Sequence, residues 1–138
     1  MQKIVIDTNV LVSSFIQRGY PYLIVDLFFE QKIKLCISDE VIEEYYNVLN
    51  REKFSKYPDF LLRAELLLAD IETKAARFTP KLKVRMISDR NDNKFLELAG
   101  ESKANFLITG NTNDFTMAAY RKTKIVTPKE YLEKYSPS

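Results

Sequence analysis

Short apolar runs alternate along the chain with longer segments in which apolar residues recur every three or four positions. The first pattern predicts strands, and the second predicts amphipathic helices. Strands are expected near residues 3–6, 33–37, 75–78, 105–109 and 124–126. Helices are expected near residues 10–17, 21–28, 39–50, 59–73 and 92–103, with a further helix around Tyr131 and Leu132. This alternation predicts an α/β protein, a three-layer α/β/α sandwich on a parallel sheet.

Residues 1–138 are expected to form a single domain, because no repeat, low-complexity segment or linker interrupts the pattern. The helix expected at 59–73 carries an apolar band made of Leu61, Leu62, Leu66, Leu67 and Ile71.

Acidic residues recur where the expected strands and helices meet. Asp7-Thr8-Asn9 follows the first strand, and Ser38 caps a helix that carries Glu43 and Glu44. Asp92 begins the helix before the strand at 105–109, and that strand leads into Thr109-Gly110-Asn111, with Asp114 close behind. Because sites in open parallel α/β sheets form beyond the carboxyl ends of the strands, these side chains are candidates for one site.

Helical phase selects among the neighbouring acids, because successive residues differ by 100° around the helix axis. Glu44 borders the apolar stripe of its helix (Val41, Tyr45, Val48 and Leu49), whereas Glu43 points to nearly the opposite side. Asp92 shares a face with Phe95, Leu96 and Ala99, and Asn93 and Lys94 are expected to rotate away from it. Asp7, Glu44 and Asp92 are therefore the acids expected to point inward.

Each of these acids also has a purely structural explanation. Asp7 can cap the helix that follows it, Asp92 can favour a helix N-terminus, and Glu44 can reach water from a boundary position. A cluster is harder to explain, because two carboxylates ~4 Å apart repel each other by ~4 kcal/mol at an effective dielectric of ~20. Near neutral pH such a cluster needs protonation or a cation, and oxygen ligands favour Mg²⁺ or Mn²⁺.

The absence of histidine narrows the chemistry further. Serine–histidine and cysteine–histidine nucleophiles, histidine acid–base ribonuclease mechanisms and most catalytic zinc sites are excluded. The single cysteine, Cys36, lies in an apolar stretch and is expected to be a core residue rather than a nucleophile. With one cysteine, no signal-peptide pattern and no apolar run long enough to span a membrane, the expected location is the cytoplasm.

The net charge of +2 does not mark the whole molecule as a nucleic-acid binder. A local basic run is nevertheless present, and it consists of Lys74, Arg77, Lys81, Lys83, Arg85 and Arg90. It is either a solvated loop and strand edge or a surface that binds a phosphate backbone.

Four segments in this order resemble the PIN-domain family, and within it the VapC-like toxins of bacterial toxin–antitoxin pairs. They are the opening run 5–13 with Asp7-Thr8-Asn9, the step Glu44-Tyr45 before Val48-Leu49, the run 89–96 with Asp92, and Leu107-Ile108-Thr109-Gly110-Asn111. The resemblance implies a five-stranded parallel sheet and RNA cleavage that depends on Mg²⁺ or Mn²⁺.

The resemblance also assigns roles to residues. It implies that Asp7, Glu44 and Asp92 are catalytic and bind the metal, with Asn111 or Asp114 as a further ligand. Many members have an acid where this chain has Asn111, so the number of ions, one or two, stays open. Supporting hydrogen bonds are expected from Thr8, Asn9, Ser13 and Asn93, and contacts with RNA from Lys81, Lys83, Arg85 and Arg90.

The implied partners are an RNA substrate, an antitoxin protein and a second copy of the chain, with no membrane. The main alternative is a PIN-like module that binds RNA or protein with weak or no catalysis, since the fourth acid is missing. A haloacid-dehalogenase-like phosphatase is a weaker alternative, because it would need a second aspartate at the position of Asn9. A receiver domain fits the order of the acids poorly.

Overall fold

The computed structural model of the chain describes residues 1–85, 87, 90–111 and 115–137, with the backbone alone at residues 90 and 91. Within these residues six strands form one sheet in the order β3-β2-β1-β4-β6-β5. The strands are β1 Lys3–Ile6, β2 Lys34–Ile37, β3 Ala76–Arg77, β4 Phe106–Ile108, β5 Ala119–Tyr120 and β6 Thr123–Val126. Five of them are parallel, and β5 runs antiparallel to β6. The expected α/β fold on a parallel sheet is confirmed, and β5 extends the sheet by a short edge strand.

Helices follow most of the strands, as the sequence pattern predicts. They are α1 Thr8–Ile16, α2 Tyr20–Phe29, α3 Asp39–Leu49, α4 Phe60–Lys74, α5 Arg90–Ser102 and α6 Pro128–Glu130, with a 3₁₀ turn η1 Glu52–Phe54 and a π-helical segment η2 Tyr131–Tyr135. Among the described helices, none is both long and apolar enough to cross a membrane.

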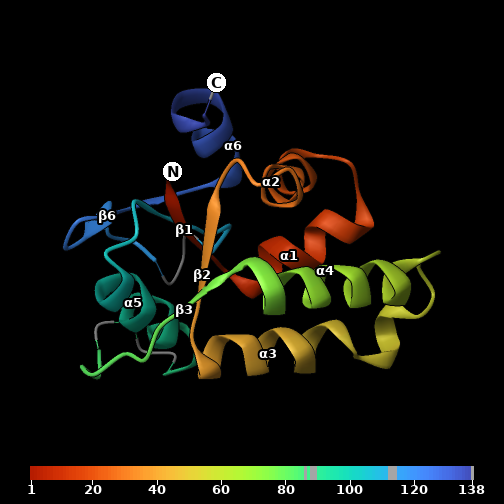
Figure 1. The fold of residues 1–138 in the computed structure, drawn as a ribbon, viewed down its shortest axis with the longest axis horizontal. Coiled ribbons are helices and arrows are strands. Elements are labelled where there is room, and N and C mark those ends of the chain that lie inside the picture. Colours follow the sequence, from red (N-terminus) through yellow and green to blue (C-terminus); the bar gives the residue numbers. More distant parts are fainter. Residues whose placement is uncertain (86, 88–89, 112–114, 138) are drawn as a thin grey trace.

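The order of the strands determines which face each helix covers. The chain moves from β1 through β2 to β3 in one direction, and it then returns past β1 to form β4. Because such crossovers are right-handed, helices on the outward path and on the return path cover opposite faces. In Figure 1, α1, α3 and α4 lie on one side of β1 and β2, and α5 lies on the other.

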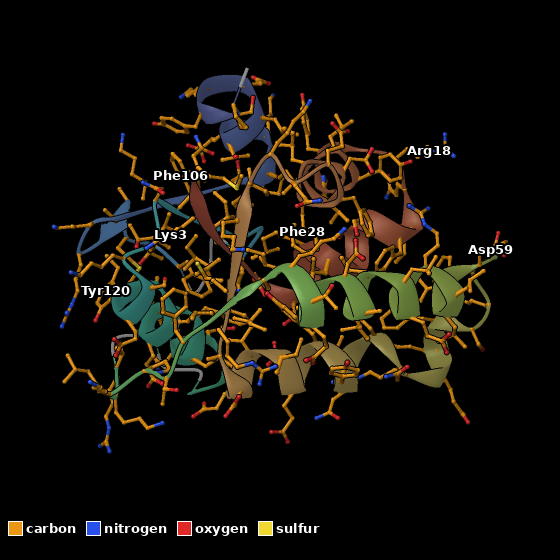
Figure 2. All side chains as sticks on the ribbon, viewed as in Figure 1. Lys3, Arg18, Phe28, Asp59, Phe106 and Tyr120 are labelled. Carbon is orange, nitrogen blue, oxygen red and sulfur yellow. The ribbon has the colours of Figure 1, made fainter. Side chains whose placement is uncertain are left out.

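Both faces of the central strands are therefore covered, and the residues of β1 are almost fully buried. Ile4, Val5 and Ile6 are each at most 1% exposed. Apolar residues from the helices complete one core, as Figure 2 shows for Phe28 in the interior, with Arg18 and Asp59 at the periphery.

The apolar band expected on α4 is only partly buried. Leu67 and Ile71 face the core, but Leu61, Leu62 and Leu66 are 42%, 57% and 58% exposed. The buried face is set instead by Phe60, whose ring stacks on Phe54 at 4.7 Å and meets the edge of Phe15 at 5.4 Å. Counting from Phe60, the buried positions follow helical spacing through Ala64, Leu67, Leu68 and Ile71.

Candidate active site

The candidate site lies at the carboxyl end of the sheet, between β1 and β4. The chain leaves β1 through α1 toward β2, whereas it leaves β4 toward β6 on the other side. In open α/β sheets, ligands bind where the connections that follow two neighbouring strands leave in opposite directions. The backbone N–H of Asp7 donates to the carbonyl of Ile108 at 3.0 Å, so the residues that follow the two strands lie side by side.

Asp7 is the most buried acid of this region and is 3% exposed. It caps α1, and its Oδ1 accepts a hydrogen bond from the backbone N–H of Asn9 at 3.3 Å. The hydroxyl of Thr109 donates to its other oxygen, Oδ2, at 2.7 Å. Both carboxylate oxygens are therefore held in fixed directions.

The pKa of Asp7 is raised above its ordinary value, chiefly because burial penalises the charged form. The negative charge of Glu44 adds to the rise, while the hydrogen bonds from Thr109 and from the backbone N–H groups of Asn9 and Thr8 oppose it. A positive charge close to Asp7 would relieve this penalty.

Glu44 lies on the inner side of α3, as the helical phase predicts, and both of its oxygens have partners. The hydroxyl of Thr8 donates to Oε2, and the Lys94 ammonium lies 2.8 Å from Oε1. The side chains of Lys94 and Glu44 are only 15% and 20% exposed. Glu44 thus connects α3 to α1 on one side and to α5 on the other.

α3 is fixed under the site by Tyr45, the residue next to Glu44. Tyr45 is fully buried, and its hydroxyl donates to the carbonyl of Ile6, directly before Asp7. Burial raises the pKa of Tyr45 well above its ordinary value, so the phenol stays protonated and can donate this bond.

Asp92 lies in the first turn of α5 and is linked to Asp7 through two residues that follow β4. The side-chain amide of Asn111 lies 3.5 Å from Asp92 Oδ2, and the backbone N–H of Asn111 donates to the Thr109 hydroxyl at 3.0 Å. Since that hydroxyl in turn donates to Asp7, a chain of hydrogen bonds runs from Asp92 to Asp7. The structure therefore brings the three acids of the sequence prediction to one region.

Asn93 and Lys94, which are expected to rotate away from the face of α5 that carries Asp92, have partners elsewhere in the protein. Asn93 is 5% exposed, and its amide pairs with the backbone of Ile87, accepting at 3.0 Å and donating at 2.8 Å. The segment before α5 also returns along the helix, where the Val84 N–H donates to Glu97. Val84 and Ile87 therefore contact a second side of α5. The packing of the helix against the sheet does not predict these contacts.

The other residues expected to form hydrogen bonds with the acids differ in the groups that they contact. Thr8 reaches Glu44 through its hydroxyl, whereas Asn9 reaches Asp7 through its backbone N–H. Ser13 is exposed on α1, and within the described part of the chain its side chain makes no hydrogen bond to the three acids. Asn93 supports the segment around Ile87 rather than a carboxylate.

Several cations of the basic run are paired with acidic side chains, among them Lys74 with Asp70 and Arg77 with Asp39 and Glu72. Lys83 is paired with Glu40 at 3.0 Å and lies 3.7 Å from Glu97, whereas Lys81 and Arg85 are exposed. The side chain of Arg90 lies outside the described residues, as does Asp114. The assignment of these cations to RNA stays a prediction.

Two residues of this site had no role in the sequence analysis, Thr109 and Lys94. Thr109 could have been found from its position directly after β4, the strand that pairs with β1. Lys94 could not, because its contact joins α5 to α3 across 50 residues of sequence.

A divalent metal is the ion that these side chains fit by type, since the donors are carboxylate, amide and hydroxyl oxygens. Among the described residues, no three acidic side chains form a ready metal-binding cluster. The carboxylates are held by Thr109, Asn111 and Lys94.

Comparison with known proteins agrees with this arrangement. The family model of the PIN domain matches residues 3–113. The chain is also 32% identical, over 142 aligned positions, to the uncharacterized protein MJ1680 of Methanocaldococcus jannaschii, an alignment that covers 96% of this chain and 91% of the relative. PIN nucleases typically use divalent metals, in accord with the donor set at the end of β1. The chain therefore belongs to the PIN-domain family, which is related to nucleases.

Proposed function

We propose that this protein is a ribonuclease that hydrolyses phosphodiester bonds with a Mg²⁺ or Mn²⁺ ion. The observation that carries the proposal is the chain of hydrogen bonds that joins Asp7 to Asp92 through Thr109 and Asn111. It gathers oxygen donors around a buried carboxylate at the carboxyl end of the sheet. No histidine is needed for such chemistry.

In this proposal Asp7 and Asp92 hold the ion, with Asn111 or Asp114 as a further ligand. When bound, the ion supplies the Lewis acidity that phosphodiester hydrolysis requires. Asp7 has a fixed orientation, because Thr109 and the Asn9 N–H hold its two oxygens. Hydrogen bonds of this kind around a ligand preserve its direction.

The hydroxyl proton of Thr109 points in a defined direction. Its oxygen accepts from the Asn111 N–H, so its own hydrogen is directed to Asp7 Oδ2. This bond keeps the Asp7 carboxylate from rotating and favours its ionised form, which is the form that binds a cation. Exposed Lys81 and Arg85 are the candidates to hold the RNA backbone by charge.

The proposal is tested by cleavage of RNA in Mn²⁺ with the variants Asp7→Asn and Asp92→Asn. Each removes one ionised oxygen donor, and the rate is expected to fall by at least about 100-fold. Asp39→Asn is the matched control, because Asp39 is an exposed acid at the start of α3 that pairs with Arg77. Wild-type rates for both site variants would contradict the proposal.

A second candidate function is binding of RNA or protein without cleavage. It is favoured by two observations: Asn111 supplies a neutral amide near Asp92, and the charge of Glu44 is already compensated by Lys94. Titration of Mn²⁺ against melting temperature separates the two functions, since a ligand that binds only the folded state raises it. No shift at millimolar Mn²⁺ would favour the binding module.

The finer part of the proposal concerns partners. A toxin role, with an antitoxin protein that covers the acidic site and with a dimer of the chain, is supported by the resemblance to VapC-like sequences. Growth of cells that express the wild-type chain or Asp7→Asn tests it: growth arrest by the wild type alone is expected, and equal growth would contradict a toxin role.

A further inference from the structure

A pocket of about 210 Å³ lies beside the C-terminal half of α5, at the end of the helix away from Asp92. Three cations line this α5 pocket: Lys81 on the segment before α5, Lys103 directly after the helix, and Arg121 in the turn between β5 and β6. All three are exposed, and among the described residues none of them forms an ion pair. Their charges are therefore available to a ligand.

Two acids also line the α5 pocket, but both hold the segment before α5. Glu101 accepts the backbone N–H of Lys81 at 3.1 Å, and Glu97 accepts that of Val84 at 2.9 Å. Glu97 also lies 3.7 Å from the ammonium of Lys83. The acids thus fix this segment to the helix, and the three cations outnumber them.

The turn that carries Arg121 is fastened to α5 by its neighbours. The ring of Tyr120 packs on Gly100, where an added Cβ would lie only 3.2 Å from the ring. The Thr123 hydroxyl donates to the carbonyl of Ala104 at 2.7 Å, directly beyond the end of the helix. The Arg121 guanidinium lies 5.6 Å from the centre of the Tyr120 ring. These contacts place a cation and an aromatic ring together at the α5 pocket.

The backbone at two of the three cations is strained. Lys103 and Arg121 have φ angles of 55° and 53°, in the left-handed region that Gly and Asn adopt more readily than other residues. Arg121 also belongs to a two-residue hairpin turn, where Gly, Asn and Asp are preferred. Strain of this kind is common at ligand-binding positions, so the two cations are better explained by binding than by stability.

The segment before α5 connects the α5 pocket to the candidate active site. Its backbone N–H groups donate to α5 side chains in reverse order: Lys81 to Glu101, Val84 to Glu97 and Ile87 to Asn93. The segment therefore runs back along the helix from the pocket toward Asp92. The length of α5 from Asp92 to Ser102 is about 15 Å at ~1.5 Å per residue. A stacked strand covers this length in about four to five nucleotides, at ~3.4 Å each.

We propose that the α5 pocket binds a phosphate group of single-stranded RNA, several nucleotides away from the bond at the acidic site. The planar guanidinium of Arg121 can donate two N–H bonds to one phosphate, and Lys103 and Lys81 supply further charge. Cations beside an aromatic ring are the usual means of holding a single strand without reading its sequence. This inference rests on the proposed function for its ligand, RNA, and does not require the cleavage step.

The experiment measures binding of a labelled single-stranded RNA, long enough to span α5, to the whole chain by fluorescence anisotropy. EDTA is present, so that metal-dependent cleavage does not interfere. Arg121→Asn and Lys103→Asn each remove one phosphate contact. We expect each to lower the affinity by about three- to tenfold and to reduce the slope of log affinity against log salt by ~0.7.

Arg18→Asn is the matched control. Arg18 is also exposed and lies 5.5 Å from the centre of a tyrosine ring, that of Tyr22. Figure 2 shows Arg18 and Tyr120 at opposite sides of the molecule, so this variant removes the same charge far from the α5 pocket. Its RNA affinity should equal that of the wild type.

Thermal melting separates binding from a structural role of Arg121. Asn adopts the left-handed conformation more readily than Arg, so Arg121→Asn should melt at or above the wild-type temperature. A variant that keeps or gains stability while it loses RNA affinity is expected only if Arg121 serves the ligand.

Three results would overturn the proposal. The first is wild-type RNA affinity in the folded double variant Lys103→Asn/Arg121→Asn. The second is an equal loss of affinity in Arg18→Asn, because binding would then follow net charge alone. The third is displacement of the RNA by polyglutamate at the same concentration of charge, which would assign the α5 pocket to an acidic protein segment.

Cleavage assays in Mn²⁺ distinguish this inference from the proposed function. If the wild type binds RNA through Arg121 and Lys103 but does not cleave it, the nuclease proposal fails and the α5 pocket is supported. If the wild type cleaves RNA and the double variant has the same KM, the α5 pocket proposal fails and the nuclease proposal is supported.

Discussion

Burial of the Asp7 carboxyl group lowers the stability of the metal-free protein at neutral pH, and it favours the binding of a cation. Its raised pKa means that the folded protein binds the proton more tightly than the unfolded chain does. Between the unfolded value near 3.8 and the raised folded value, the folded state holds more protons. Stability contributed by this group therefore falls as the pH rises through that window. Above it, the metal-free protein carries the cost of a buried charge.

Asp7→Asn removes that charge and keeps the shape of the side chain. We expect the metal-free variant to melt a few degrees above the wild type at pH 7, because the desolvation penalty is gone. The difference should shrink as the pH falls toward 3.8, where the wild-type carboxyl is protonated as well. Thermal melts in EDTA across this pH range measure the difference in melting temperature. A variant that is less stable than the wild type at pH 7 would contradict a destabilising effect of the buried Asp7 charge.

Thr109→Val breaks the link between Asp7 and Asn111. The change removes the Thr109 hydroxyl that bonds Asp7 Oδ2 and the Asn111 N–H, and it is expected to cost about 1–3 kcal/mol of unfolding free energy. Cleavage should fall by about 10- to 100-fold, because a metal-binding carboxylate loses its orientation. Thr109→Ser keeps the hydroxyl and is the control in both measurements. Equal behaviour of the two variants would remove Thr109 from the site.

At the scale of single elements, α4 shows how one aromatic residue at the start of a helix determines its buried face. The expected apolar band did not include Phe60, but Phe60 and its ring contacts determine which side faces the core. Leu67 is 1% exposed, whereas the neighbouring Leu66 is 58% exposed.

This pair makes a matched test of the packing of α4. Leu67→Ala is expected to lower the unfolding free energy by about 2–5 kcal/mol, because it leaves a cavity in the core. Leu66→Ala should change it by less than about 0.5 kcal/mol, as is usual at exposed positions. Chemical denaturation measures both, and equal losses would contradict the orientation of α4.

α5 shows a different limit of sequence reasoning. Periodicity correctly places Phe95, Leu96 and Ala99 in the core, where each is fully buried. It cannot show that the preceding segment folds back onto the helix and buries Asn93, because that contact depends on a loop without a repeating pattern. The same limit hides the Lys94–Glu44 pair, which joins two helices through long side chains.

For the whole molecule, the fold and the general location of the site were predictable from the sequence. Both follow from repeating features: alternating strands and helices, and acids at the ends of strands. The chain of hydrogen bonds from Asp7 to Asp92 was not predictable, because it requires β1 and β4 to be neighbours, and the sequence does not specify strand order. The antiparallel strand β5, with two residues, is too short to give a pattern.

The whole molecule carries a net charge of only +2. Acidic side chains gather at the carboxyl end of the sheet, while exposed Lys81 and Arg85 lie on the segment before α5. A phosphate backbone that approaches Asp7 is therefore repelled unless a cation is present. The proposed metal dependence therefore has an electrostatic reason in addition to the ligands themselves.

The most direct measurement is the rate of RNA cleavage by the purified wild-type chain in EDTA, and again after Mn²⁺ or Mg²⁺ is restored. Asp7→Asn protein, purified in the same way, controls for contaminating nucleases. We expect cleavage to stop in EDTA, to return with either ion, and to be absent from the variant throughout. Cleavage by the wild type that persists in EDTA, or no cleavage with either ion, would contradict a metal-dependent ribonuclease built around Asp7.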